Sequence, residues 1–192
     1  MIHKGNSQDI TTGQEKVLES LTVTNEYARM DAAMKLDNER RAVINKLIAI
    51  LNGTNADIVK VDAVIVLGQY RAQESIPILL RHLEWDELTS KSSISGTVFG
   101  NPPLEVGAKD YGTVTMALKQ IGMPAVPALL DKITQTDDTK ITTKCVSICK
   151  AIEGPDVTGF RLKALLDKET DPKIKARIQS ALDALKKLDP AK

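Results

Sequence analysis

The sequence predicts an all-α fold built from stacked helical hairpins. Almost every apolar segment has the period of a helix, and strand-like alternation between Asn/Gly turn pairs is missing. The second observation is an internal repeat of helical segments, described below. The third is the scarcity of aromatic residues, which make up 3% of the chain. A core built from this sequence must therefore be aliphatic.

Composition limits the classes of partner. The 192-residue chain carries 26 Lys+Arg against 25 Asp+Glu, so its net charge is +1. This balance gives no overall electrostatic attraction to nucleic acid or anionic lipid. The few aromatic residues leave almost no material for base stacking, and no run of about 18 apolar residues exists that could span a membrane. We expect no nucleic-acid partner and no membrane insertion.

The predicted helices have recognisable start and stop signals. Thr12 and Glu15 form a capping-box pattern before a short apolar segment. Asp37 is expected to cap a helix that ends before Gly53 and whose inward residues include Val43 and Ile44. Further helices are expected from residue 55 or 57 to about 68, and at 74–85, 111–121, 124–133, 140–152, 157–168 and 172–188. The last begins at Asp171-Pro172, where Asp caps and Pro is favoured at the first helical position.

The chain is expected to divide into three parts. Residues 1–36 form an N-terminal segment of short helices, capping or partly mobile. Residues 37–188 form a single repeat domain with an inserted loop at 86–109, and 189–192 form a C-terminal tail. The polar N-terminus lacks the apolar core of a signal peptide. This favours a cytoplasmic protein, with export after removal of a leader as the alternative.

The internal repeat is visible in four aligned helical segments. Their closing residues are separated by 51, 31 and 33 positions: Leu67, Leu118, Cys149 and Leu182. Removing about 20 inserted residues from the first gap leaves a period near 32. The partner helices repeat too, because 76–80 (Ile-Pro-Ile-Leu-Leu) matches 126–130 (Val-Pro-Ala-Leu-Leu), with 42–48 and 160–166 as weaker versions. One such helix pair cannot bury its apolar face alone, so neighbouring pairs must stack.

The repeated segments resemble a known family. Ala117-Leu118, Ile121-Gly122 and 126–130 are similar to the short HEAT-like repeat of the phycobilisome-lyase type. The likeness spans roughly 55–188, with 37–53 as a capping half. It implies a right-handed α-solenoid of HEAT-like helical hairpins, with first helices convex and second helices concave. The sequence departs from the family where Cys149 replaces the usual Leu, where the third unit lacks its Pro, and at the 86–109 insertion.

The resemblance implies a function in binding. Solenoids of this kind usually bind proteins or extended peptides on the concave face. That face would carry the exposed positions of 38–51, 74–85, 124–135 and 157–168. We predict a non-catalytic protein- or peptide-binding scaffold that uses the concave face, the 86–109 loop, or both. The alternative that the likeness implies is an accessory subunit of a tetrapyrrole (bilin) lyase-like complex. A HEAT-like DNA-binding enzyme is disfavoured, because the charge is near zero and one Trp is present.

Five side chains are candidate binding residues: Arg81, Trp85, Phe99, Tyr111 and Arg161. The three aromatics are half of the six in the chain, and they flank or occupy the inserted loop. Long loops without secondary structure are often functional. The alternative is that Trp85 fills the interface between repeats and the loop folds back over the solenoid edge.

No catalytic, metal or cofactor site is predicted. Cys145 and Cys149 have no nearby His and no CxxC spacing, so we expect two buried thiols. His82 and Glu84 are two residues apart and diverge on a helix, which favours a helix-end His near the C-terminal dipole. Asp137-Asp138 precedes a predicted helix and indicates a cap rather than a metal site. The His-Glu dipeptides of HEAT-like metal hydroxylases are missing.

Overall fold

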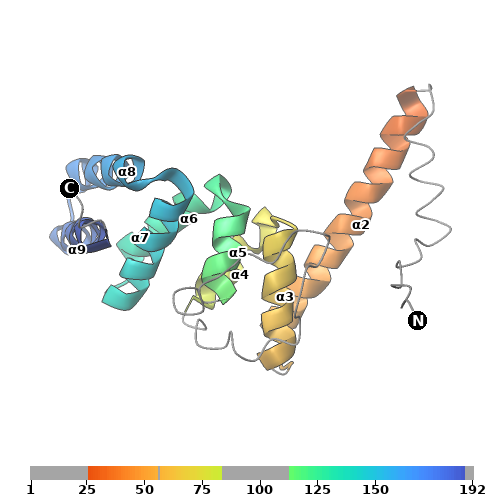
Figure 1. Ribbon diagram of the computed structural model, residues 1–192, viewed down its shortest axis with the longest axis horizontal. Helices are drawn as coiled ribbons and strands as arrows, with labels where there is room; N and C mark the ends of the chain where they lie inside the picture. The colour runs from red at the N-terminus through yellow and green to blue at the C-terminus, as the bar shows by residue number, and fades with distance from the viewer. Residues whose placement is uncertain (1–25, 56, 84–112, 189–192) are drawn as a thin grey trace, which may run out of the picture. The chain divides into compact units, whose positions relative to one another are not determined.

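The computed structural model describes residues 26–55, 57–83 and 113–188 (Figure 1). These residues form helices and the turns between them, and none of them lies in a strand. The described part of the chain is therefore all-α. The chain separates into two compact units, 1–46 and 47–192, which are described in turn. The capping-box prediction at Thr12 and Glu15 lies outside the described residues.

In the first unit, helix α2 (Glu26–Asn52) runs without a break through position 37, where the sequence predicts that a new helix begins; its last residues belong to the second unit. The prediction that Asp37 caps a helix is wrong, because Asp37 lies inside α2 and pairs with Arg41 at 2.6 Å. The residues before it, 32–36 (Ala-Ala-Met-Lys-Leu), are good helix formers and give the helix no reason to begin at 37. Ile44 is buried as expected, whereas Val43 is exposed.

In the second unit, helices follow the predicted order with boundaries shifted by a few residues. The elements are α3 (Asp57–Gln69), η1 (Gln73–Ser75), α4 (Ile76–Arg81), α5 (Thr113–Ile121), η3 (Met123–Ala125), α6 (Val126–Gln135), α7 (Thr139–Glu153), α8 (Pro155–Lys168) and α9 (Pro172–Leu188). The short 3₁₀ turns η1 and η3 each lead directly into a helix with Pro in its first turn. The predicted helices at 74–85 and 124–133 therefore each open as a 3₁₀ turn.

The turns within successive hairpins share one backbone feature. Arg71, Gly122 and Gly154 are the described residues with positive φ, at 49°, 79° and 86°. They are separated by 51 and 32 positions, close to the 51 and 31 of the sequence repeat. Positive φ is cheap for Gly and uncommon for Arg. The repeat in sequence is thus matched by a repeat in backbone conformation.

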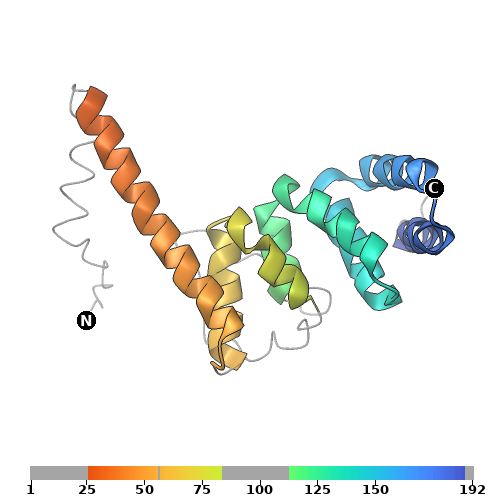
Figure 2. The ribbon, with the colours of Figure 1, turned by 180° about the vertical axis from the view of Figure 1, so that it is seen from behind.

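The helices of the second unit pack in a regular order. Helix α3 packs against α5, α5 against α7, and α7 against α9, while α4 contacts both α5 and α6 (Figures 1 and 2). Helix α8 packs on α7 and α9. Among the residues whose side-chain burial the structure describes, no buried hydrophobic side chain is aromatic, as the composition predicts. The largest include Leu67, Leu79, Leu118, Leu129, Ile133, Ile148, Leu162 and Ile178.

The α3–α5 contact depends on a glycine. A Cβ atom added to Gly68 would lie 2.7 Å from the Cα atom of Ala117. Backbone atoms cannot move aside as a flexible side chain can, so the glycine is what permits the two helices to approach this closely. Gly68 directly follows Leu67, the closing residue of the first repeated segment, and it permits close packing between hairpins.

The caps of α7 and α9 and the two cysteines agree with expectation. The Asp138 carboxylate accepts hydrogen bonds from the backbone N–H of Lys140 (2.7 Å) and Ile141 (3.3 Å), which confirms the predicted cap. Asp171 caps α9 in the same way. Cys145 and Cys149 are free, buried thiols, and burial raises the pKa of each to about 12.

Candidate binding surface

Two of the five predicted binding residues lie in the described part of the chain. Arg81 is at the end of α4 and Arg161 is in α8, so they belong to different hairpins. Trp85, Phe99 and Tyr111, with the 86–109 loop, lie outside the described residues. Arg81 is exposed, and its Nη2 donates to Oδ1 of Asn52 at 3.3 Å. That contact ties Arg81 to the last residue of α2.

Arg161 is held by a buried carboxylate. Its Nε donates to Oε2 of Glu153 at 2.8 Å. The Glu153 side chain is only 3% exposed, whereas that of Arg161 is 43% exposed. The hydroxyl of Thr158 lies 3.3 Å from Oε1 of Glu153 and 2.9 Å from the carbonyl oxygen of Gly154. The guanidinium therefore reaches solvent from a fixed anchor at the α7–α8 turn.

An exposed apolar pair lies beside Arg161. Phe160 is 73% exposed, more than any other large hydrophobic side chain whose exposure the structure describes, and Val157 is 43% exposed. Both stand on the outer face of α8, because Thr158 and Leu162 occupy its fully buried positions. Three residues apart on a helix, Val157 and Phe160 are surface neighbours.

Sequence comparison between repeats missed this pair. The alignment of 160–166 with the second-helix segment 76–80 does not show which of its residues face outward. A helical wheel centred on Leu162 places Thr158 inward at i−4 and turns Phe160 away. The helical periodicity around Leu162 is therefore the sequence feature that predicts the exposure of Phe160.

His82 ends α4, as the sequence predicts, and is partly buried. The pKa of His82 is lowered, mainly because burial disfavours the charged imidazolium, and further by the nearby charges of Arg81 and Lys60. A hydrogen bond with the Leu51 backbone acts in the opposite direction. Burial therefore favours the neutral imidazole over the imidazolium.

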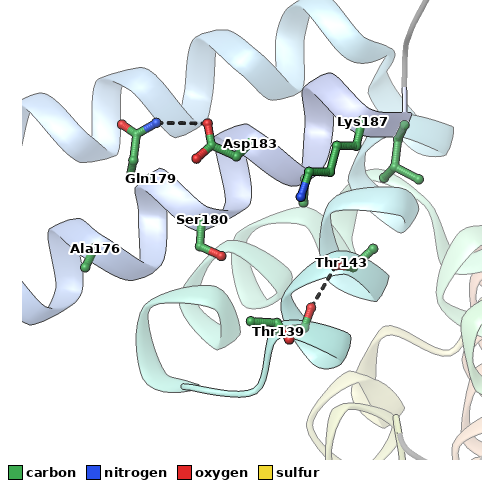
Figure 3. A pocket seen from close by; sticks show the side chains of 9 residues that line it. Thr139, Thr143, Ala176, Gln179, Ser180, Asp183 and Lys187 are labelled. Carbon is green, nitrogen blue, oxygen red and sulfur yellow. Dashed lines mark hydrogen bonds between the residues drawn. The ribbon is translucent and has the colours of Figure 1, made fainter.

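A groove of about 660 Å³ lies between α7 and α9 (Figure 3). Small and hydroxyl side chains form much of its lining, and α9 adds an amide and both charges: Thr139, Thr143, Ala176, Gln179, Ser180, Asp183, Ala184, Lys187 and Leu188. Gln179 donates to Asp183 at 3.2 Å, and the Thr143 hydroxyl donates to the Thr139 carbonyl at 2.7 Å. The groove is a concave surface lined by hydrogen-bond donors and acceptors. It was not predicted, because it joins helices that are distant in sequence.

The described residues contain neither a cluster of metal ligands nor a helix that could span a membrane. Within 26–55, 57–83 and 113–188, no three His, Cys, Asp or Glu side chains gather closely enough to hold a metal ion. Over that same part of the chain, no helix has the length and apolar character needed to cross a membrane.

The chain matches no protein-family model. No curated protein and no solved structure matches it either. The HEAT-like resemblance therefore remains an expectation drawn from the repeated residues.

Proposed function

We propose that the protein is a non-catalytic, right-handed α-solenoid of HEAT-like hairpins that binds a protein or peptide on the face formed by its second helices. The observation that carries this proposal is the exposure of Phe160, at 73%, with Val157 beside it. Large aromatic side chains contribute strongly to binding when a partner covers them. In a chain with six aromatic residues, an outward Phe is better explained by binding than by folding.

Three features support the solenoid arrangement. Helices α3, α5, α7 and α9 pack in sequence, each against the next. The positive-φ residues Arg71, Gly122 and Gly154 recur with the spacing of the repeat. Stacked repeats bury a continuous core between neighbours, and the largest buried side chains of the described core are aliphatic.

The polar network at the start of α8 favours binding over catalysis. Arg161 and Thr158 both hydrogen-bond to the Glu153 carboxylate, so that buried group is already satisfied. A nucleophile activated by a neighbouring base would need a different arrangement. The 86–109 loop remains in the proposal as a second contact, through Phe99 within it and Trp85 and Tyr111 at its flanks.

The test compares two variants of the full chain. Phe160→Ser removes the exposed aromatic from α8, and Val59→Ser removes a 41%-exposed apolar side chain from α3. Wild type and Val59→Ser are expected to retain the same polypeptide from the native extract, and Phe160→Ser is expected to lose it. Equal retention by all three proteins would remove the α8 face from the proposal.

A further inference from the structure

Arg161 leaves part of its guanidinium available on the α8 face. Nε carries the hydrogen bond to Glu153. Among the residues that the structure describes, no hydrogen-bond acceptor is found for its Nη1 or Nη2. The 43% exposure of the side chain places these nitrogens within reach of solvent. An arginine anchored through Nε is oriented before any ligand arrives.

A fixed guanidinium suits a carboxylate. Its paired N–H groups match the two oxygens of a carboxylate in a fork geometry. Because the side chain is already ordered by Glu153, less conformational freedom is lost when a ligand binds. Glu153 also offsets part of the positive charge, so a singly charged carboxylate is better matched than a phosphate, which needs several cations.

Apolar and cationic side chains run in parallel along α8. Val157 and Phe160 lie on the outer face, with the half-buried Ala164 following at the next turn. Lys168, seven residues after Arg161, is exposed on the same side of the helix as the arginine. A ligand that lies along α8 would meet an apolar strip with a positive edge.

We propose that the α8 face binds a segment of a partner polypeptide in which an Asp or Glu lies close to a bulky apolar residue. The apolar side chain packs on Phe160 and Val157, and the carboxylate accepts hydrogen bonds from Nη1 and Nη2 of Arg161. Glu153 is a positioning residue, because it orients the guanidinium and does not contact the ligand. This inference rests on the proposed function and names the chemistry of its partner.

The experiment selects random peptides displayed on phage with the immobilised full chain. An enriched peptide is then synthesised with its acidic residue intact and with Asn or Gln in that position. Wild type is expected to prefer the carboxylate form by about tenfold or more. Arg161→Gln should lose this preference while still binding the apolar part. Lys163→Gln, which removes an exposed cation from a different side of α8, should keep it.

The role of Glu153 has its own pair of variants. Glu153→Gln keeps an acceptor for Nε and is expected to keep the carboxylate preference. Glu153→Ala frees the guanidinium and is expected to reduce the preference without removing apolar binding. If Glu153→Ala does not fold, Glu153→Gln still tests the positioning role. Loss of the carboxylate preference in Glu153→Gln would contradict a role that depends on the hydrogen bond to Nε.

The outcomes separate this inference from the proposed function. If Phe160→Ser abolishes binding but Arg161→Gln leaves the preference unchanged, the carboxylate subsite is wrong and the binding face stands. Enriched peptides without an acidic residue lead to the same conclusion. If no selected peptide depends on Phe160, both the binding face and the subsite are overturned.

Discussion

Nε of Arg177 donates a hydrogen bond of 2.7 Å to Oδ1 of Asp137. This contact joins the first turns of α9 to the turn that precedes α7. Nη1 of Arg177 also donates to the Thr134 carbonyl at 2.6 Å, and Lys173 pairs with Asp137 at 3.2 Å. Two helices that are distant in sequence are thereby held at their N-terminal ends, on either side of the α7–α9 groove.

Asp137 gives the fold a contribution that depends on pH. The hydrogen bond from Arg177, followed by that from Lys173, lowers the pKa of Asp137 from 3.8 to about 2. Because this pKa is lower in the folded state, the ionised Asp137 carboxylate stabilises the fold at pH values above its unfolded pKa, near 4. This stabilisation is lost as the pH falls toward 2. Asp137→Asn should therefore lower the urea midpoint at neutral pH, and the difference should vanish near pH 2.

The control for this measurement is Asp167→Asn, which changes an exposed carboxylate on α8. Its urea midpoint should follow that of wild type at every pH. If the difference in urea midpoint between Asp137→Asn and wild type persists unchanged down to pH 2, the ion pair is not the source of that difference.

Gly68 should tolerate no side chain. An added Cβ would meet the Ala117 backbone at 2.7 Å, so Gly68→Ala is expected to destabilise by about 1–3 kcal/mol through overpacking. Gly159→Ala is the matched change within a helix, because its Cβ would meet Leu185 at an ordinary 3.4 Å. There the better helix propensity of Ala should leave stability equal or higher, by up to about 1 kcal/mol. Equilibrium unfolding of the two variants compares them, and equal effects would contradict the close α3–α5 approach.

The buried leucines of the repeated second helices should control stability. Leu79 and Leu129 are fully buried, and truncation of either to Ala should cost about 2–5 kcal/mol. Val157→Ala, on the exposed face of α8, should change the free energy of unfolding by less than about 0.5 kcal/mol. An unchanged denaturation midpoint for Leu129→Ala would show that the inward face of α6 is misassigned.

The two thiols should be unreactive in the native protein. Burial raises the pKa of Cys145 and Cys149 to about 12, so almost no thiolate exists at pH 8. A thiol-specific chromogenic reagent is expected to react with neither thiol in the native state and with both in denaturant. Rapid native modification of either cysteine would contradict its placement in the core of α7.

Local signals explain which parts of the fold the sequence predicts. Asp138 and Asp171 were identified as caps because a cap depends on nearby residues, and the burial of Cys145 and Cys149 follows from the period of one helix. The prediction that Asp37 caps a helix is wrong because a good capping residue does not start a helix when the residues before it also favour a helix.

The binding surface was less accessible to prediction from sequence. Arg161 was identified from its segment, but the buried Glu153 that holds it belongs to the preceding helix. Phe160 is not among the predicted binding residues, although Thr158 and Leu162 fill the inward positions of α8 and turn it outward. The α7–α9 groove depends on a contact between helices separated by α8, which no local pattern records.

Photo-crosslinking from position 160 tests the central claim most directly. A benzophenone amino acid replaces Phe160 in one protein and Val59 in the other, and both full chains are irradiated in the native extract. We predict a discrete cross-linked polypeptide from position 160 that is absent from position 59, and that excess wild type suppresses but excess Phe160→Ser does not. The same products from both positions, or none from position 160, would contradict a polypeptide-binding face on α8.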